Sequence, residues 1–353
     1  MSKTDPGNFF EDFRLGQEIR HATPRTVTEG DCALYTALYG SRFALASSAE
    51  FARALGLKRA PVDDFLAFHV VFGKTVADVS LNAVANLGYA DGRFGVPVYP
   101  GDTLSTVSRV IGLKENSNRQ TGVVTVRSTG TNQDGAMVVA YCRWVMVRKR
   151  DPAAPAPAEA VPDLPAAVAA ADLVVPAGLT TAGYDTALAG SPHVWEDYAV
   201  GEKIDHVDGT TIEEAEHMMA TRLWQNTAKV HFNQHTEGQG RFGRRLVYGG
   251  HIISIARALS FNGLANAFKV VAINGGRHTN PTFAGDTIYA WSEVVEKIAI
   301  PGRADVGALR LRLVALKNRS AATFAFKAAD GKEYDPAVVL DFDYTVLMPR
   351  RGA

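Results

Sequence analysis

The stretch FFEDFRLGQEIRH, residues 9–21, returns later in the chain as VWEDYAVGEKIDH, residues 194–206. Five of the thirteen positions are identical at an offset of 185, and most of the others are exchanged like for like. A second pair, RFGVPVYPGDTL (93–104) and RHTNPTFAGDTI (277–288), aligns at an offset of 184. Two windows with almost the same offset predict a tandem duplication of a unit of about 150 residues, far longer than the repeats of a solenoid.

A proline-rich segment separates the two copies. Residues 151–165 contain five of the sixteen prolines of the chain. Such a run is typical of an extended, semi-rigid connector, because it sustains neither a helix nor the interior of a sheet. We therefore expect an N-terminal domain at 1–150, a connector at 151–190 and a C-terminal domain at 191–353, with a separate core in each domain.

The hydropathy pattern of each copy predicts one long apolar helix followed by strands. The helices are expected from Phe65 to about Val79 and from Ile252 to about Phe268, because few polar side chains interrupt these stretches. Alternation of apolar and polar residues at 309–313 and at 323–327 has the period of two that indicates antiparallel strands. Helix and meander together predict an α+β fold.

Composition excludes several classes of partner. Lysine plus arginine equals aspartate plus glutamate at 37 each, so no net charge attracts nucleic acid or an anionic membrane. The chain has neither a run of about 18 apolar residues nor an apolar leader, and we expect a cytoplasmic protein. Cys32 and Cys142 are too few for a disulfide framework.

The runs NTAKVHFN (226–233) and RFGRRLVYGG (241–250) resemble the hydratase motif of the MaoC-like hot-dog family. That motif has an Asp, a His five residues later, and a Phe-Gly-x-Arg-x-x-His-Gly segment that leads into the central helix. The resemblance implies tandem hot-dog folds, each an antiparallel sheet wrapped round a central helix. It also implies a hydro-lyase acting on a 2-enoyl-CoA, with mesaconyl-CoA and β-methylmalyl-CoA as the favoured pair and coenzyme A as part of the substrate, not a cofactor.

Hydration of a double bond conjugated to a thioester requires a base, a proton source and donors for the enolate oxygen. A neutral imidazole at His231 fits the base. Gly249 and Gly250 precede the expected helix, where free backbone N–H groups face an incoming oxygen and glycine permits close approach of the thioester. The resemblance makes the Gly249 N–H the oxyanion donor, and we place Tyr248 beside the substrate.

The chain departs from the family pattern at Asn226, where the pattern has a carboxylic acid. An amide positions water but delivers no proton at neutral pH. Either the His231 imidazolium and a water carry out all proton transfer, or an acid enters from elsewhere. The candidates for that acid are Glu237, Glu216, Asp63 and Asp64.

The first copy has Ser41 and Ala46 at the positions of Asn226 and His231. It therefore cannot run this chemistry, and we expect it to complete the acyl-CoA tunnel.

Arginines are expected to hold the negative charges of the substrate. Arg222 and Arg257 are the candidates for the extra carboxylate of a dicarboxylyl thioester, with Arg257 expected to face the same chamber as Gly249. Arg241, Arg244 and Arg245 are candidates for the phosphates of coenzyme A, although a solvated surface cluster is an equally good interpretation.

Two other functions fit the same residues: a thioesterase on the same fold, and an acyl-CoA binding protein without activity. His231 and His235 are four residues apart, but no third ligand follows, so we expect no metal. A homodimer or higher homo-oligomer is possible, although the two halves could already form the usual side-by-side pair within one chain.

Overall fold

The computed structural model describes residues 3–352, and its strands run antiparallel. The strands of the first half are β1 (Glu18–Thr26), β2 (Ala83–Phe94), β3 (Thr103–Glu115), β4 (Thr121–Thr131) and β5 (Met137–Arg148). Those of the second half are β6 (Lys203–Thr211), β7 (Lys269–His278), β8 (Thr287–Ala299), β9 (Val306–Lys317) and β10 (Val338–Pro349). Within the described range they form one ten-stranded sheet in the order β1-β3-β4-β5-β2-β7-β10-β9-β8-β6.

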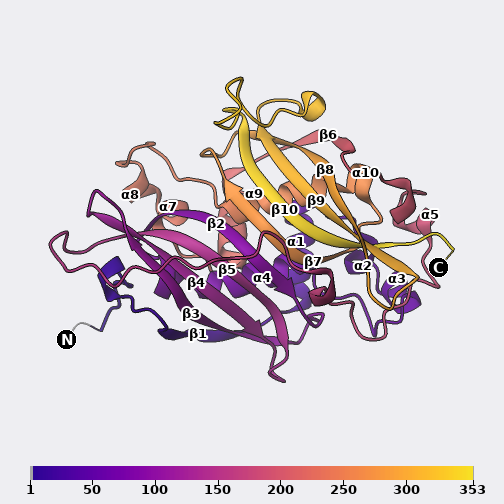
Figure 1. Cartoon of the computed structure of the whole chain (residues 1–353), viewed down its shortest axis with the longest axis horizontal. Helices are drawn as coiled ribbons and strands as arrows, with labels where there is room; N and C mark the ends of the chain where they lie inside the picture. Colours follow the sequence, from indigo (N-terminus) through magenta and orange to yellow (C-terminus); the bar gives the residue numbers. More distant parts are fainter. Residues whose placement is uncertain (1–2, 353) are drawn as a thin grey trace.

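The helices lie mainly on one side of this sheet, behind it in Figure 1. In the first half they are α1 (Glu29–Tyr39), α2 (Ala44–Ser47), α3 (Ala49–Ala54) and α4 (Asp64–Lys74). In the second they are α5 (Thr186–Ala189), α6 (Glu214–Leu223), α7 (Lys229–Phe232), α8 (Gln234–Glu237), α9 (Gly249–Leu259) and α10 (Phe261–Leu264). None of the helices in residues 3–352 is long and apolar enough to cross a membrane.

The strand order confirms the predicted duplication and the α+β fold. It reads the same from either end when each strand is exchanged for its counterpart, with β2 and β7 as the central pair. These two strands pair antiparallel, with Tyr89 opposite Gly276 and Arg93 opposite Ala272. The halves therefore share one continuous sheet, with α4 and α9 as the central helices.

The expectation of two separate cores is wrong. One hydrophobic cluster contains buried residues of both halves, from Val27 in the first to Met348 in the second. The His69 imidazole of α4 and the Ser254 hydroxyl of α9 are joined by a hydrogen bond of 3.0 Å. Because the helices meet across the centre, their apolar faces fill a common interior. The domain boundaries remain predictions.

The connector is fixed to the sheet. Ala160 forms an isolated bridge with Leu113, and the Val168 N–H donates to the Asn274 side chain at 3.0 Å. Leu173 and Leu179 are buried among apolar residues of both halves. The proline-rich segment is thus a strap that crosses the sheet, and not a free tether.

The predicted apolar helices are present with different bounds. The first ends at Lys74 and continues as a π-helical turn, η2 (Val76–Ser80). The second begins at Gly249, three residues earlier than predicted, and α9 ends at Leu259. The turn that follows, α10, is interrupted at Gly263, whose φ is +99°. A left-handed residue of this kind interrupts the helical ladder, and glycine adopts it without strain.

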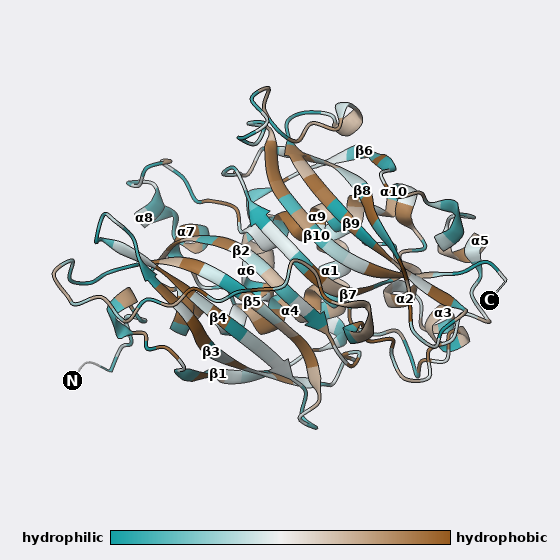
Figure 2. Ribbon diagram, in the orientation of Figure 1, coloured by the Kyte–Doolittle hydropathy of each residue, from teal (hydrophilic) through white to brown (hydrophobic). Residues whose placement is uncertain are grey.

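One predicted strand is correct and one is wrong. Alternation at 309–313 lies in β9, and Figure 2 shows its mixed hydropathy. Residues 323–327 form no strand, because Phe324 has a φ of +49° after a 3₁₀ turn, η5 (Ala321–Thr323). The rings of Phe324 and Phe326 lie 5.6 and 6.2 Å from that of Trp291. The alternation there reflects a loop packed on the sheet.

We predict that Gly73→Ala destabilises the protein. A Cβ at Gly73 of α4 would lie 1.7 Å from the Trp224 carbonyl oxygen of the other half, so backbone must move. Overpacking of this kind typically lowers the free energy of unfolding by about 1–3 kcal/mol, measurable by urea unfolding.

Gly30→Ala is the matched control. Gly30 lies in the exposed first turn of α1, where the nearest atom to a new Cβ is the Thr28 hydroxyl at 3.5 Å. It should leave stability unchanged or slightly raised, since alanine favours the helix. Equal stability of the two variants would contradict this account of the contact between the halves.

Candidate active site

His231 lies in the short helix α7, immediately after the Asn226 loop. Its Nδ1 donates to the Leu246 carbonyl oxygen at 2.8 Å, which fixes the ring and leaves Nε2 as the acceptor. No residue in the described part of the chain forms a hydrogen bond with Nε2. Burial lowers the pKa of His231 to about 4, so the imidazole is neutral at physiological pH. This is the state that a general base requires.

Other imidazoles surround His231. The ring centroid of His217 lies 6.3 Å from that of His231, and the ring of His251 lies 5.6 Å from that of His217. The Tyr248 N–H donates to His217 Nε2 at 3.0 Å, and His251 Nδ1 is 2.8 Å from the Tyr39 hydroxyl. These imidazoles therefore act as neutral acceptors that hold the walls of the site.

His278, at the end of β7, completes the group from another direction. Its Nε2 lies 3.3 Å from the Tyr89 hydroxyl, which comes from the first half of the chain. Its pKa is lowered to about 4 by burial and by the nearby His231. The first half thus contributes a side chain to the wall even though it carries no base.

The first turn of α9 offers two unused backbone donors. Tyr248 is the N-cap residue and makes no side-chain cap. No acceptor among the described residues takes the N–H groups of Gly249 or Gly250. Tyr248, the residue before these donors, places its ring 5.4 Å from that of His231, so the start of α9 and the His231 ring are joined through Tyr248. The start of the helix can therefore receive a thioester oxygen.

Rings of the protein lie on the Cβ side of both glycines. A Cβ at Gly249 would lie 2.3 Å from the His278 ring, and one at Gly250 would lie 2.3 Å from the Tyr248 ring and 2.5 Å from His69. Any side chain at 249 or 250 would therefore clash with these rings. The close approach of the thioester to the backbone N–H groups stays a prediction.

Asn226 is buried and supports the loop that presents His231. The side-chain oxygen of Asn226 accepts the Ala228 N–H at 3.2 Å, and the backbone N–H of Asn226 donates to the Thr221 carbonyl oxygen. The side-chain NH₂ group remains as a donor. The structure thus gives Asn226 a positioning contact, while a role toward substrate stays a prediction.

None of the four candidate acids pairs with His231. Asp63 accepts the Phe65 N–H as the N-cap of α4, and Asp64 pairs with Lys269 at 2.6 Å. Glu216 is exposed on α6, and Glu237 lies at the end of α8. No carboxylate of residues 3–352 forms a hydrogen bond or an ion pair with the imidazole of His231.

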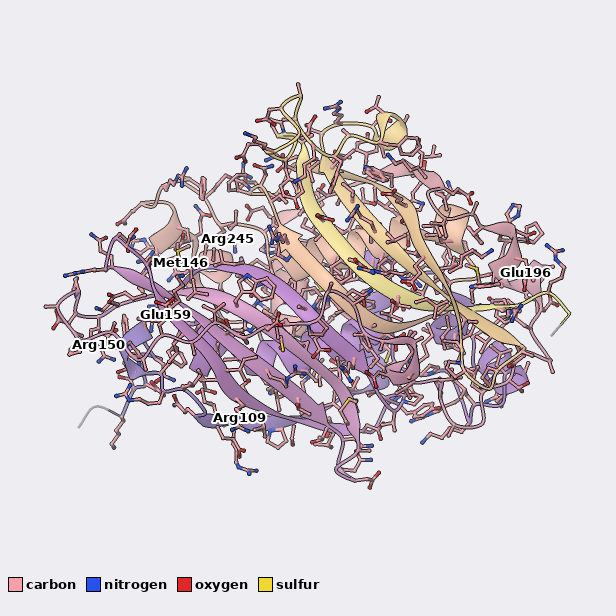
Figure 3. All side chains as sticks on the ribbon, viewed as in Figure 1. Arg109, Met146, Arg150, Glu159, Glu196 and Arg245 are labelled. Atoms are coloured by element: carbon pink, nitrogen blue, oxygen red, sulfur yellow. The ribbon has the colours of Figure 1, made fainter. Side chains whose placement is uncertain are left out.

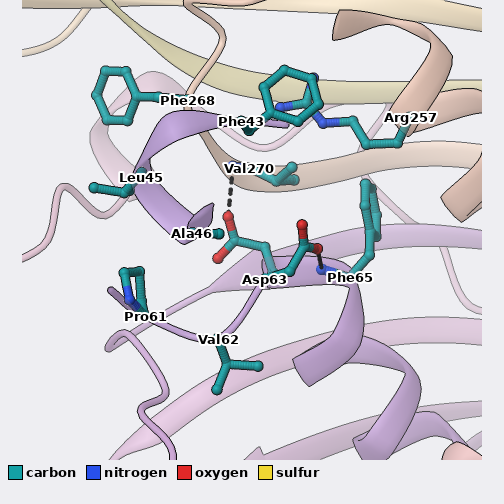
Figure 4. Close-up of a pocket in the computed structure, with 11 residues that line it drawn as sticks. Phe43, Leu45, Ala46, Pro61, Val62, Asp63, Phe65, Arg257, Phe268 and Val270 are labelled. Carbon is teal, nitrogen blue, oxygen red and sulfur yellow. Dashed lines mark hydrogen bonds between the residues drawn. The ribbon is translucent and has the colours of Figure 1, made fainter. Parts of the chain in front are cut away.

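Asp63 and Asp64 instead line a pocket of the first half, shown in Figure 4. Ala46 lines it too, and Ser41 and Ala46 both line the pocket beside it. At the offset of 185, Ala46 corresponds to His231 and Asp63 to Tyr248, so this is the counterpart of the candidate site. Here the start of the central helix is occupied by the protein's own carboxyl groups.

Arg257 lies in this counterpart pocket and not with His231, unlike the prediction. Its guanidinium carbon is 3.4 Å from the centre of the Phe43 ring, and it donates to Ser260 at 3.3 Å and to the Ala267 carbonyl oxygen. Figure 4 shows it beside Phe43, across the pocket from Asp63.

The other arginines predicted to bind the substrate lie near the surface. Arg245, labelled in Figure 3, pairs with Glu214, and Arg244 donates to the Ala284 carbonyl oxygen at 2.6 Å. Arg241 and Arg222 are exposed, with the Arg241 guanidinium 5.2 Å from the Phe242 ring. Their predicted roles toward phosphate or carboxylate stay predictions.

The sequence reasoning missed His217, His251 and His278. His251 directly follows the Tyr-Gly-Gly turn, and His278 stands inside the second repeated window, so both were next to motifs already recognised. His217 lies outside the repeated windows and the hydratase motif, so no sequence pattern indicated a role for it. No group of three or more His, Cys, Asp or Glu among residues 3–352 is arranged to hold a metal ion.

We predict acid-sensitive stability from the fully buried imidazoles. Burial lowers the pKa of His69 and His251 to about 3 and that of His217 to about 2, against 6.5 when unfolded. Below pH 6.5 these histidines are protonated in the unfolded chain but not in the folded chain. Their contribution to the free energy of unfolding is therefore fully present above pH 6.5 and is lost as the pH falls towards 3. Each histidine adds at most about 1.4 kcal/mol per pH unit.

Denaturant unfolding at a series of pH values measures this slope. His251→Asn keeps an acceptor for the Tyr39 hydroxyl and should reduce the slope by about one proton. His193→Asn, at an exposed position, should not change it. A wild-type slope of zero between pH 6 and 4 would show that these imidazoles are not held neutral.

Comparison with known proteins shows which sequences are similar to this chain. A family model described as mesaconyl-CoA hydratase matches residues 2–329. The β-methylmalyl-CoA dehydratase of Chloroflexus aurantiacus is 70% identical over 351 residues, which cover 99% of each chain. The mesaconyl-CoA hydratase of Cereibacter sphaeroides is 64% identical over 350 residues, 99% of this chain and 100% of that one.

Solved structures give the same result. A MaoC domain dehydratase from Chloroflexus aurantiacus covers both chains completely, with a TM-score of 0.97 and 70% identity. A Mycobacterium tuberculosis protein with a double hotdog fold covers 98% of this chain and 99% of its own, with a TM-score of 0.78 and 26% identity. These matches confirm the resemblance and the tandem hot-dog fold.

Proposed function

The chain belongs to the mesaconyl-CoA hydratase family of MaoC-like double hot-dog proteins, and on this premise we propose how it interconverts mesaconyl-CoA and β-methylmalyl-CoA. The reaction is the reversible addition of water to an enoyl thioester, catalysed by a hydro-lyase. The acyl-CoA is the partner, and coenzyme A enters and leaves as part of it.

His231 acts first as base and then as acid. Its Nε2 takes a proton from water, and the hydroxide oxygen forms a bond to the β-carbon while the π electrons move to the thioester enolate. The Nε2–H then returns its proton to the α-carbon. We assign both proton transfers to this imidazole because no carboxylate of the described residues contacts it, and we assign to the Asn226 NH₂ group, whose Oδ1 already accepts from Ala228, the positioning of the water.

The free N–H groups of Gly249 and Gly250 stabilise the enolate oxygen. They lie at the positive end of α9, where no side chain competes for them. The observation that carries this proposal is the position of the neutral, singly anchored imidazole of His231 beside this uncapped helix start.

We predict that His231→Ala lowers the hydration rate by about 10²–10⁴-fold, the usual contribution of a general base. The measurement is the loss of absorbance of the enoyl thioester in mesaconyl-CoA. His231→Ala should fold normally, by circular dichroism, since its main contact is with one carbonyl oxygen at the wall of the site.

His193→Ala is the control because His193 is exposed, and it should keep full activity. Retention of more than a tenth of the activity by His231→Ala would exclude the imidazole as the base. Release of free thiol from mesaconyl-CoA would indicate the thioesterase alternative, and tight binding without turnover would indicate the binding-protein alternative.

A further inference from the structure

Arg143 of β5 is a buried cation without a carboxylate partner. It is 1% exposed, and its Nη2 donates to the neutral hydroxyls of Thr75 at 2.7 Å and Ser80 at 3.3 Å. Its Nε has no hydrogen-bond partner, and no Asp or Glu of the described residues lies within ion-pair distance. Burial lowers the pKa of Arg143, because the charged guanidinium loses its hydration.

Two of the other buried cations are paired with carboxylates. Lys149 pairs with Glu115 at 2.7 Å, and Lys269 pairs with Asp64 at 2.6 Å. A guanidinium taken out of water without a counter-charge is strongly unfavourable.

The buried Lys74 and Arg257 have no carboxylate partner either, but each donates to a carbonyl-type oxygen, Lys74 to the Gln225 amide oxygen and Arg257 to the Ala267 carbonyl oxygen. Among the described residues Arg143 donates only to hydroxyls. It is therefore the least compensated of these buried cations.

Two unpaired hydroxyls lie around the same point. The hydroxyls of Tyr141 and Tyr248 are buried and form no hydrogen bond of ordinary geometry. The Phe72 ring lies near all three side chains. Its centre is 4.3 Å from the Arg143 guanidinium carbon, 6.2 Å from the centre of the Tyr141 ring and 5.6 Å from the centre of the Tyr248 ring. Together Arg143, Tyr141 and Tyr248, here called the Arg143 cluster, hold three unused donors.

Tyr248 connects this cluster to the reacting groups. It precedes Gly249 in the chain and places its ring 5.4 Å from that of His231. The four-carbon backbone of mesaconyl carries a free carboxylate at the end opposite the thioester, about 4 Å away by standard bond lengths. A thioester oxygen at Gly249 therefore brings that carboxylate to the neighbourhood of Tyr248.

We propose that the Arg143 cluster binds the free carboxylate of the acyl group and selects a dicarboxylyl thioester over a monocarboxylic one. This rests on the proposed function, and it gives Arg143 the role that the sequence suggested for Arg222 or Arg257. The carboxylate accepts hydrogen bonds from Nε and the two tyrosine hydroxyls, so charge and donors are satisfied together. Without the substrate, both remain uncompensated.

The test compares mesaconyl-CoA with 2-methylcrotonyl-CoA, in which a methyl group replaces the free carboxylate. Affinity by calorimetry and kcat/KM by absorbance are measured for wild type and Arg143→Met. Arg143→Met should weaken binding and lower kcat/KM for mesaconyl-CoA by about 10–150-fold, the usual range for a lost charged hydrogen bond. The values for 2-methylcrotonyl-CoA should stay unchanged or rise.

Tyr141→Phe and Tyr248→Phe test the cluster if Arg143→Met does not fold. Each removes a hydroxyl that forms no hydrogen bond in the protein, so stability should not fall while the affinity for mesaconyl-CoA falls about tenfold. Tyr344→Phe is the matched control, because Tyr344 also has a buried unpaired hydroxyl but packs against Phe342 and Phe65 of the core. It should bind both thioesters as wild type does.

Equal losses on both thioesters would overturn the proposal, since they indicate a structural role for Arg143. Unchanged affinity for mesaconyl-CoA in all three cluster variants would overturn it too. Failure of the proposed function is a separate result: wild type would then hydrate neither thioester, while calorimetry would still report whether affinity depends on the carboxylate and on Arg143.

Discussion

The uncapped first turn of α9 is the constraint on which the rest of the site depends. Most helices satisfy their first N–H groups with a side chain, yet Tyr248 provides none. The rings that lie against these two glycines are those of His278, Tyr248 and His69, and burial lowers the pKa of both histidines, so they stay neutral. No carboxylate of the described residues accepts from the two donors, whereas Asp63 caps the corresponding turn of α4.

Both halves are needed to maintain these surroundings. The base and the helix start come from the second half, but Tyr39 and Tyr89 of the first half hold His251 and His278 in place. The shared sheet and the contact of α4 with α9 bring these groups together. The candidate site is thus built from both copies: the second provides the imidazole and the helix start, and the first provides the tyrosines that contact the neighbouring histidines.

Local patterns predicted the features that are themselves local. The repeated windows predicted the symmetry of the sheet, and the Tyr-Gly-Gly turn predicted the start of the central helix α9 to within three residues. The roles of His231 as base and of Gly249 as donor stay predictions. What failed depends on contacts distant in sequence. His217 reaches the site only through the tertiary fold, and the phenylalanines of 323–327 alternate because they pack on Trp291. Arg257 is eight residues beyond Gly249, about 80° further round the helix, so it faces the other pocket.

The counterpart pocket differs from the candidate site in what occupies the start of its central helix. There Asp63 accepts the Phe65 N–H, and Asp64 accepts the Val270 N–H and pairs with Lys269. An enolate entering this pocket would meet two carboxyl groups where α9 offers bare amides. Introducing an imidazole at Ala46 would leave these carboxyl groups in place, so a base alone would not make this pocket equivalent to the start of α9. The twofold architecture therefore carries two unlike pockets, only one of which has the groups of the candidate site.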